Sequence, residues 1–358
     1  MLLTLAPQGL SMSLLTSLIS HQIWLQRTAS GEVKDLAPFI KEMRDEIKRQ
    51  VLLFGDDGRS TARLNKLLRD LEEALAGLTG DWRTKLTEDL KELAAYEAEW
   101  NVKTLTTNVN AEFVTPTAEQ VWAAAEFQPL SLSYKPVDFT KLMSGWGETE
   151  VARLVTGVKM GFVQGQTTRQ IVKNVVGAGG LTDISERTAA TVIRTALSHV
   201  SNEARNETYR QNDDIIEKYE WVSTLDSRTS TICRVRDGMT WRIGKGPMPP
   251  AHPNCRSTTA PVISSEFDFL DKGAKRAAKG AYGGTQVSAD TTYYEFLKQQ
   301  PAWFQDQALG PVRGKIFRNS GISPEEFRVI SVDGFGNPLT LKQMAELDKR
   351  VADYLKGD

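Results

Sequence analysis

Residues 221–256 form the most constraining stretch of this 358-residue chain, because they hold both of its cysteines and one of its three histidines. The stretch is short, basic and rich in turn-forming residues, which argues against one regular helix or strand along its length. Cys233, His252 and Cys255 lie in it in a Cys-x18-His-x2-Cys arrangement. We refer to residues 221–256 as the knuckle and predict a small β-containing module there.

Three interpretations of this Cys/His trio are open at the level of sequence. In the first, the trio and a carboxylate from Asp226 or Asp237 hold a zinc ion, which binds sulfur and imidazole ligands at such spacing. In the second, the cysteines are a reduced pair, or oxidise after cell lysis, while His252 bonds to backbone. In the third, all three are packed turn residues, since small buried thiols need no partner.

Asp226 and Arg228 directly follow a predicted strand at residues 219–224. At such a position a carboxylate accepts backbone N–H groups, and the guanidinium braces carbonyls or the acid itself. A catalytic carboxylate needs a second acid, a metal or a histidine nearby to tune its pKa, and the sequence offers no clear companion. We therefore interpret the pair as structural. His21 and His199 fall on predicted helices and are interpreted as packing or surface residues.

Composition argues against several protein classes. The 44 Lys and Arg are balanced by 45 Asp and Glu, so no global positive charge indicates a nucleic-acid binder. Two cysteines in so long a chain argue against a disulfide-stapled secreted scaffold and fit assembly in a reducing cytoplasm. The uncharged residues 1–26 lack a basic start and a cleavage site. We expect a helix there that packs on a protein surface, with membrane contact as the alternative, and no stable membrane span.

Apolar periodicity predicts an α+β, predominantly α-helical chain in three segments, which are residues 1–140, 141–265 and 266–358. In the first segment, two apolar stripes at residues 64–78 and 82–100 are separated by Gly77 and Gly80. This pattern predicts an antiparallel helical hairpin. We predict that residues 113–136 form a connector with one brief helix at residues 118–127.

In the middle segment, helices are predicted at residues 148–164 and 167–176. Asp183 with Glu186 predicts the capped start of a longer helix that runs to about Asn212. In the last segment, a basic linker or short exposed helix at residues 272–279 is expected, followed by helices at residues 293–299, from residue 301, and at residues 340–355.

Two clusters of basic residues, in the knuckle and at residues 272–279, are candidates for contact with DNA phosphates. Such contacts are salt-sensitive and do not read bases, and an acidic partner surface is the alternative that these residues fit equally. The candidate contact residues are Arg234, Arg236, Arg242, Lys245, Lys272, Lys275, Arg276 and Lys279.

The knuckle resembles the Mu F-like minor head proteins of tailed bacteriophages, the head-morphogenesis family. The resemblance rests on an Asp-x-Arg-Thr element and a Pro-Pro-x-His-Pro-x-Cys-Arg close, and it covers about residues 145–265. Many relatives carry further cysteines where this chain has Ser230 and Ser257, so half of the thiolates of a full zinc site are absent. The motif residues are Asp226, Arg228, Cys233, Asp237, Gly238, His252, Pro253, Cys255 and Arg256.

The resemblance implies a minor capsid or head-morphogenesis protein at the portal vertex inside the virion head, assembled in the host cytoplasm, with ejection alongside the DNA as a further expectation. The implied partners are the portal protein, the major capsid or scaffolding protein, and packaged double-stranded DNA. We therefore expect a structural protein rather than an enzyme. The alternative is a metal-dependent nuclease or toxin, in which His252 activates water beside a metal held by the cysteines.

Overall fold

The computed structural model of the chain describes residues 13–56, 60–109, 111–132, 135–263, 274–334 and 336–357. It confirms a predominantly helical α+β fold with small antiparallel sheets. The helices that precede the knuckle are α1 (Leu14–Asp35), α2 (Ala37–Phe54), α3 (Thr61–Val109), α4 (Ala118–Phe127), α5 (Phe139–Val163), α6 (Thr168–Val176) and α7 (Leu181–Arg210). None of the described helices combines the length and apolarity that a membrane span requires.

The strands and the remaining helices lie mostly in the second half of the chain. The strands are β1 (Leu130–Leu132), β2 (Lys135–Val137), β3 (Ile216–Val222), β4 (Thr240–Arg242), β5 (Thr258–Ile263), β6 (Lys275–Gly280) and β7 (Gly283–Ser288). The remaining helices are α8 (Thr231–Arg236), α9 (Tyr293–Lys298), α10 (Ala302–Leu309), α11 (Pro311–Asn319), α12 (Pro324–Val329), α13 (Leu341–Leu347) and α14 (Lys349–Gly357).

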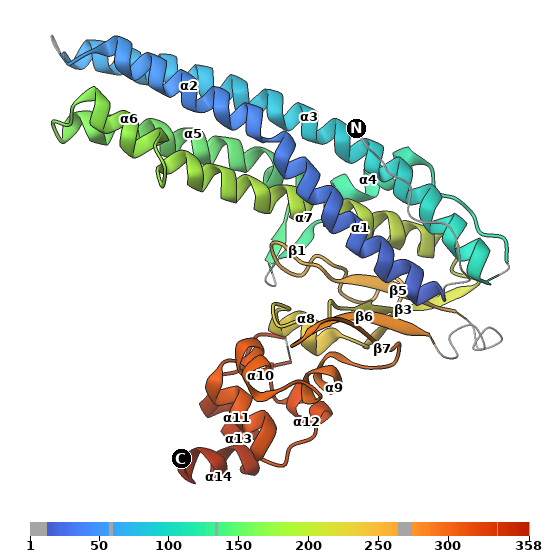
Figure 1. Cartoon of the computed structure of the whole chain (residues 1–358). Helices are drawn as coiled ribbons and strands as arrows, with labels where there is room; N and C mark the ends of the chain where they lie inside the picture. Colours follow the sequence, from blue (N-terminus) through green and yellow to red (C-terminus); the bar gives the residue numbers. More distant parts are fainter. Residues whose placement is uncertain are drawn as a thin grey trace.

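Helices α1 to α7 form an elongated bundle, which we call the helical arm (Figure 1). One hydrophobic core runs through it and joins residues on both sides of residue 140. Trp82 of α3 and Trp146 of α5, for example, meet edge to face with their ring centroids 4.4 Å apart. The domain boundary predicted near residue 140 therefore falls inside one packed bundle.

Helix α3 is a single helix of 49 residues, so the predicted antiparallel hairpin is wrong. Its buried stripe passes through Leu75, Thr79 and Trp82 without a break, at steps of four and three residues. Gly77 and Gly80 lie within the helix, and a Cβ at either position would meet no heavy atom within 4 Å. A glycine weakens a helix interior by only about 1 kcal/mol, which this packed stripe outweighs.

The predicted helix at residues 118–127 is confirmed as α4, and the one at residues 167–176 as α6, which begins after its N-cap Thr167. Helix α5 begins at Phe139, earlier than predicted, because the Asp138 side chain accepts the Lys141 N–H at 2.8 Å and caps it.

The predicted capping pair is confirmed only for Asp183: α7 begins at Leu181 with Gly180 as its N-cap, and Asp183 in its first turn accepts the Gly179 N–H at 2.7 Å. Both Asp183 and Glu186 also accept hydrogen bonds from Arg44 of α2, at 2.7 and 3.2 Å. These acids therefore tie α7 to α2. The buried face of α7 includes Ala189, Ile193, Ala196, Val200 and Ala204.

A three-stranded antiparallel sheet in the order β4-β3-β5 follows the helical arm. Its central strand β3 pairs with β5 in a register that sets Trp221 opposite Thr259. A second hairpin, β6–β7, stands where a basic linker or exposed helix was predicted, so that prediction is wrong for residues 275–280. Alternate side chains of β6, Arg276 and Ala278, are buried, as expected for a strand with one covered face.

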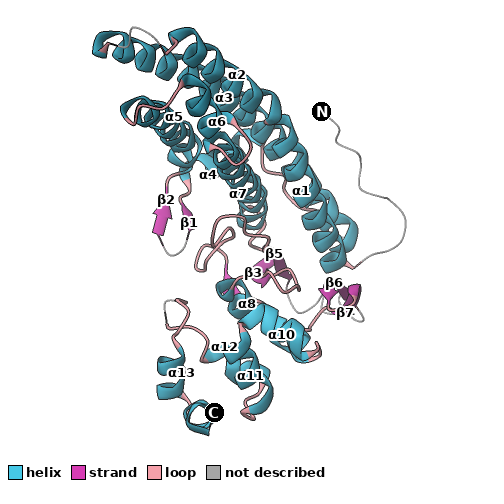
Figure 2. Cartoon of the chain, turned by 60° about the vertical axis from the view of Figure 1, so that its left-hand side comes forward, coloured by secondary structure: helices cyan, strands magenta, loops and turns pink. Residues whose placement is uncertain are grey.

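Helices α9 to α14, which we call the C-terminal block, pack around a second hydrophobic core. Leu225 and Val235 of the knuckle belong to that core, so the block is anchored on the knuckle. The predicted helix at residues 340–355 is two helices, because Asp348 adopts an extended conformation between α13 and α14. Figures 1 and 2 show the helical arm and the C-terminal block extending from opposite sides of the strands.

Candidate functional site

The knuckle begins at the end of β3 and lies between the helical arm and the C-terminal block (Figure 1). The turn that contains Asp226 and Arg228 leads into α8, and the left-handed conformation of Gly238 (φ 78°) reverses the chain into β4. A loop then returns to β5 through His252 and Cys255. The predicted β-containing module is therefore confirmed, and it also holds one short helix.

Asp226 organises the turn after β3. Its Oδ1 accepts the backbone N–H of Arg228 at 2.9 Å and the hydroxyl of Thr229 at 3.1 Å. Arg256 donates to both carboxylate oxygens, at 2.6 and 2.9 Å, in the bidentate geometry that makes Arg–carboxylate pairs strong. The Arg228 side chain is 76% exposed and only 3.8 Å from Asp226, so Arg256 is the main brace.

The protonation state of Asp226 follows from these contacts. Burial alone would raise the pKa of this carboxyl group, but the hydrogen bonds and charge of Arg256 outweigh burial, helped by the Arg228 N–H and the Thr229 hydroxyl. The pKa therefore lies below its usual value. Asp226 is a charged structural acid, as the sequence analysis expected for a turn-forming carboxylate.

Asp237 forms a second, fully buried pair with Arg276 of β6. The guanidinium donates to Oδ1 at 2.9 Å and to Oδ2 at 3.1 Å, while Oδ1 also accepts the Ser223 N–H at 2.7 Å. Arg276 further donates to the carbonyl oxygens of Ser223 and Thr291, at 2.6 and 3.1 Å. One arginine thus joins the end of β3, the end of α8 and the segment before α9.

The Cys/His trio is brought together as the sequence predicts, with its ligand atoms all within 4.8 Å of one another. The Cys233 Sγ lies 3.6 Å from the Cys255 Sγ and 3.3 Å from the His252 Nε2. The His252 Nδ1 lies 2.9 Å from the Pro253 carbonyl oxygen, to which an Nδ1–H donates. This contact directs Nε2 toward the sulfurs, where a protonated His252 donates to a thiolate and a neutral His252 would present its lone pair to a metal.

The two thiols differ in environment. Burial raises the pKa of the Cys233 thiol well above its usual value, and the neighbouring Cys255 adds to this. Burial acts in the same direction on Cys255, but hydrogen bonds from Cys233 and His252 outweigh it and hold its pKa well below the usual value. Cys255 is therefore the thiol that is deprotonated first.

The geometry of the trio fits three corners of a zinc site. The sulfur separation is close to the value of about 3.8 Å that two thiolates have around tetrahedral zinc with bonds near 2.3 Å. Asp226 and Asp237 are each bound by an arginine, so the prediction that one of these carboxylates is the fourth zinc ligand is wrong. The Ser230 hydroxyl lies next to the trio, 2.8 Å from the His252 Nε2.

A match to a known protein family covers most of the residues that form this site. Residues 152–260 match the model of the family described as Phage Mu protein F like protein. The chain contains a Mu F-like segment. The match confirms the resemblance predicted from the knuckle and runs from within α5 to within β5. No curated protein and no solved structure matches the chain.

Several basic residues proposed for DNA contact lie inside the protein, in or next to the Mu F-like segment. Arg276 is buried against Asp237, and Arg234 is buried with its guanidinium 5.2 Å from the Tyr293 ring centroid. Arg236 is half-buried over the Trp221 ring. For Arg234 and Arg276, the predicted DNA contact is therefore wrong. The exposed candidates are Arg242, Lys245, Lys275 and Lys279, and Lys272 lies outside the described residues.

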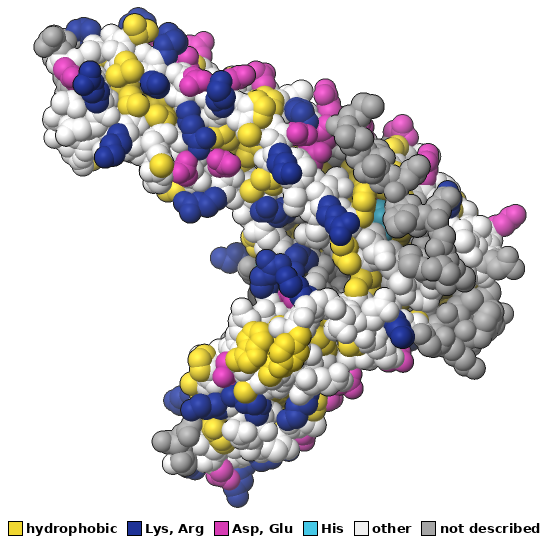
Figure 3. Space-filling model, in the orientation of Figure 1, with side chains coloured by type: hydrophobic (Ala, Val, Ile, Leu, Met, Phe, Trp, Pro, Cys, Tyr) yellow, Lys and Arg dark blue, Asp and Glu magenta, His cyan; other side chains and the backbone are white. Residues whose placement is uncertain are grey.

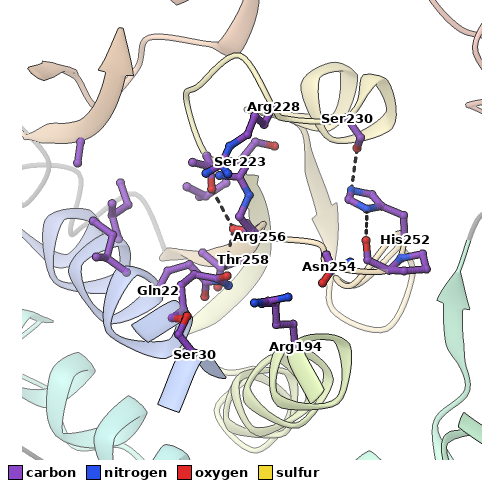
Figure 4. A pocket seen from close by; sticks show the side chains of 17 residues that line it. Gln22, Ser30, Arg194, Ser223, Arg228, Ser230, His252, Asn254, Arg256 and Thr258 are labelled. Atoms are coloured by element: carbon purple, nitrogen blue, oxygen red, sulfur yellow. Dashed lines mark hydrogen bonds between the residues drawn. The ribbon is translucent and has the colours of Figure 1, made fainter. Parts of the chain in front are cut away.

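A cavity of about 860 Å³, not predicted from the sequence, lies on the arm side of the knuckle (Figure 4). Arg194 of α7 points toward it, and Arg228, Asn254 and Arg256 line it from the knuckle. The available signal was Arg194 itself, the one Lys, Arg, Asp or Glu residue within residues 189–200. The periodicity of apolar residues alone does not show which distant arginines line the same cavity as Arg194.

Proposed function

We propose that this protein is a structural component of a phage head, a minor capsid protein inside the capsid near the portal vertex. The Mu F-like match over residues 152–260 carries the proposal and supports a role in phage head morphogenesis. The portal protein is the proposed main partner, with the major capsid or scaffolding protein as a further one. Assembly in the host cytoplasm and passage with the DNA belong to the same proposal.

The chemistry of the knuckle supports a structural rather than a catalytic role. Its two acids, Asp226 and Asp237, are each held by an arginine in a bidentate pair. A metal-dependent nuclease needs free carboxylates or a histidine to hold metals and to activate water. Both acids are instead used to connect strands, helix and loop.

Cys233, His252 and Cys255 are the residues that would hold a zinc ion. Bound there, zinc would cross-link the loop before β5 to α8 and so add its binding free energy to folding. The chain itself already positions the three side chains, through the His252–Pro253 contact and the packing of both cysteines in a small core with Trp221.

The exposed basic residues support a second part of the proposal, which is contact with packaged DNA. Arg242, Lys245, Lys275 and Lys279 project from β4, the following turn and β6 and are suited to non-specific contact with packaged DNA. Such binding weakens steeply with salt, because it releases counterions rather than reading bases.

Mass spectrometry of purified mature particles, combined with chemical crosslinking, tests the proposal. We expect the chain in particles, with crosslinks to the portal protein. Its absence from particles would contradict the proposed location.

A separate assay addresses catalysis. Purified protein incubated with plasmid and divalent metals should leave the DNA intact. Cleavage that His252→Ala abolishes would replace the structural role with the nuclease alternative.

A further inference from the structure

Two cavities adjoin each other along the knuckle. The cavity of about 860 Å³ lies against α1 and α7, and one of about 620 Å³ lies against the C-terminal block. They share Arg228, Ser230 and His252, so they are two parts of one depression. Figure 3 shows Lys and Arg side chains gathered in the notch between the helical arm and the C-terminal block.

Arginines dominate the charge of this depression, which we call the arginine groove. No aspartate or glutamate is among the described residues that line either cavity. In a chain whose acids and bases are nearly equal in number, a lining of this kind indicates an anionic ligand. The arginines that line the groove are Arg194, Arg228, Arg234, Arg256 and Arg313.

Two of these arginines are available to a ligand. Arg194 is half-buried and makes no hydrogen bond or ion pair with any described residue, and Figure 4 shows it pointing into the cavity. Arg228 is 76% exposed, and its nearest carboxylate, Asp226, is already held by Arg256. A partly buried guanidinium without a partner binds an incoming carboxylate or phosphate more strongly than a fully solvated one.

The walls of the groove favour a peptide over a nucleic acid. Ile19 and Ile23 of α1 line one end, and Leu309 and Pro338 of the C-terminal block line the other. The aromatic rings in the lining, Tyr294 and Phe327, are buried and offer no face on which a base could stack. A DNA duplex is too wide to enter the cavity and reach the half-buried Arg194, whereas an extended chain can reach both Arg194 and the exposed Arg228.

We propose that the arginine groove binds an extended acidic segment of a partner protein, in which carboxylates alternate with apolar side chains. Carboxylates would pair with Arg194 and Arg228, and the apolar side chains would pack on Ile19 and Ile23. The inference rests on the proposed function, because it gives the chemistry by which a head protein is recognised.

The proposal is tested by fluorescence anisotropy at low ionic strength with two labelled probes of equal formal charge. One is a peptide of alternating glutamate and leucine, and the other is a single-stranded oligothymidylate. We expect the peptide to bind at least about tenfold more tightly than the oligonucleotide. Arg194→Glu and Arg228→Glu should each weaken peptide binding by about tenfold.

Arg169→Glu and Lys159→Glu are matched controls, because they reverse charge at exposed positions of the helical arm outside the groove and outside the proposed DNA-contact residues. They should change peptide affinity by less than about twofold. A peptide of alternating lysine and leucine should bind the double variant Arg194→Glu/Arg228→Glu better than the parent, which shows that the variant is folded and that charge decides recognition.

Three outcomes would overturn the proposal: no binding of the acidic peptide, tighter binding of the oligonucleotide, or equal losses in the groove and control variants. Each leaves the presence of the chain in phage particles unaffected. Conversely, absence from particles would remove the head partner without removing binding of the acidic peptide, so the two failures are distinguishable.

Discussion

Asp226 and Asp237 determine the shape of the knuckle at the scale of single residues. Each buried carboxylate receives two hydrogen bonds from one arginine and at least one more from the backbone. Removing one partner of such a pair leaves a buried charge without compensation, which costs about 3–5 kcal/mol. The arginines therefore stabilise the loops in which the Cys/His trio lies.

The position of Ser230 gives a prediction about metal binding. Its hydroxyl lies 2.8 Å from the His252 Nε2, so residue 230 is adjacent to the three candidate ligands. Ser230→Cys should therefore complete a Cys3His site and raise zinc affinity by at least about tenfold, because a thiolate is a far better zinc ligand than a hydroxyl. Competition with a chromogenic chelator measures the affinity. Equal affinities of the variant and the parent would contradict this geometry.

Glu203 of α7 gives a pH prediction. Burial raises the pKa of its carboxyl to about 7, although the Asn206 amide and the charge of Arg210 oppose this. In the unfolded chain the carboxyl releases its proton near the ordinary value of 4.5. Between these values the folded state binds more protons, so the free energy of unfolding falls as pH rises and is lowered in full above about pH 7.

Glu203→Gln should remove this penalty. Above about pH 7 the variant should be more stable than the parent by an amount on the order of 3 kcal/mol, and near pH 4 the two should differ little. Urea unfolding at both pH values measures the difference, with the exposed Glu217→Gln as control. A constant difference at all pH values would show that Glu203 does not titrate in this range.

At the scale of elements, local signals predicted α4 and α6 well, because each has its cap and its apolar face within a few residues. They failed for α3, where two glycines suggested a turn that packing against α5 and α7 overrides. They succeeded only in part at the start of α7, where Asp183 and Glu186 also bind a distant arginine, Arg44. A helix cap comes from residues next to the helix end in the sequence, whereas the partner in an ion pair can lie far away along the chain.

The continuity of α3 makes Gly77 and Gly80 testable. A Cβ added at either position would meet open space, so Gly77→Ala and Gly80→Ala should each raise the free energy of unfolding by about 0.5–1 kcal/mol. Gly161→Ala is the matched contrast in α5, because its Cβ would lie 2.6 Å from the Cγ1 of the buried Ile171 and should destabilise the protein. Urea midpoints measure all three. Loss of stability in both α3 variants would indicate a turn there.

At the scale of the whole molecule, the knuckle joins two cores: Val222 packs in a core with Leu18 of α1 and Leu105 of α3, and Leu225 packs in the core of the C-terminal block. The sequence predicted that the Cys/His trio would lie together, and the structure confirms this. It paired Asp226 with Arg228, whereas the structure pairs Asp226 mainly with Arg256.

The sequence did not predict the buried position of Arg276, which was interpreted as an exposed basic residue because lysines lie near it in the sequence. Arg276 faces inward to Asp237 because side chains alternate between the two faces of β6. That strand forms because it pairs with β7.

Hydrogen exchange of Arg276→Met, compared with the exposed control Lys275→Met, tests the junction most directly. Arg276 bonds to Asp237, to Ser223 at the end of β3 and to Thr291 before α9. If the knuckle joins the two cores, protection should fall together in β3 and in α9 of Arg276→Met and stay unchanged in Lys275→Met. A loss confined to the β6–β7 hairpin would contradict the junction.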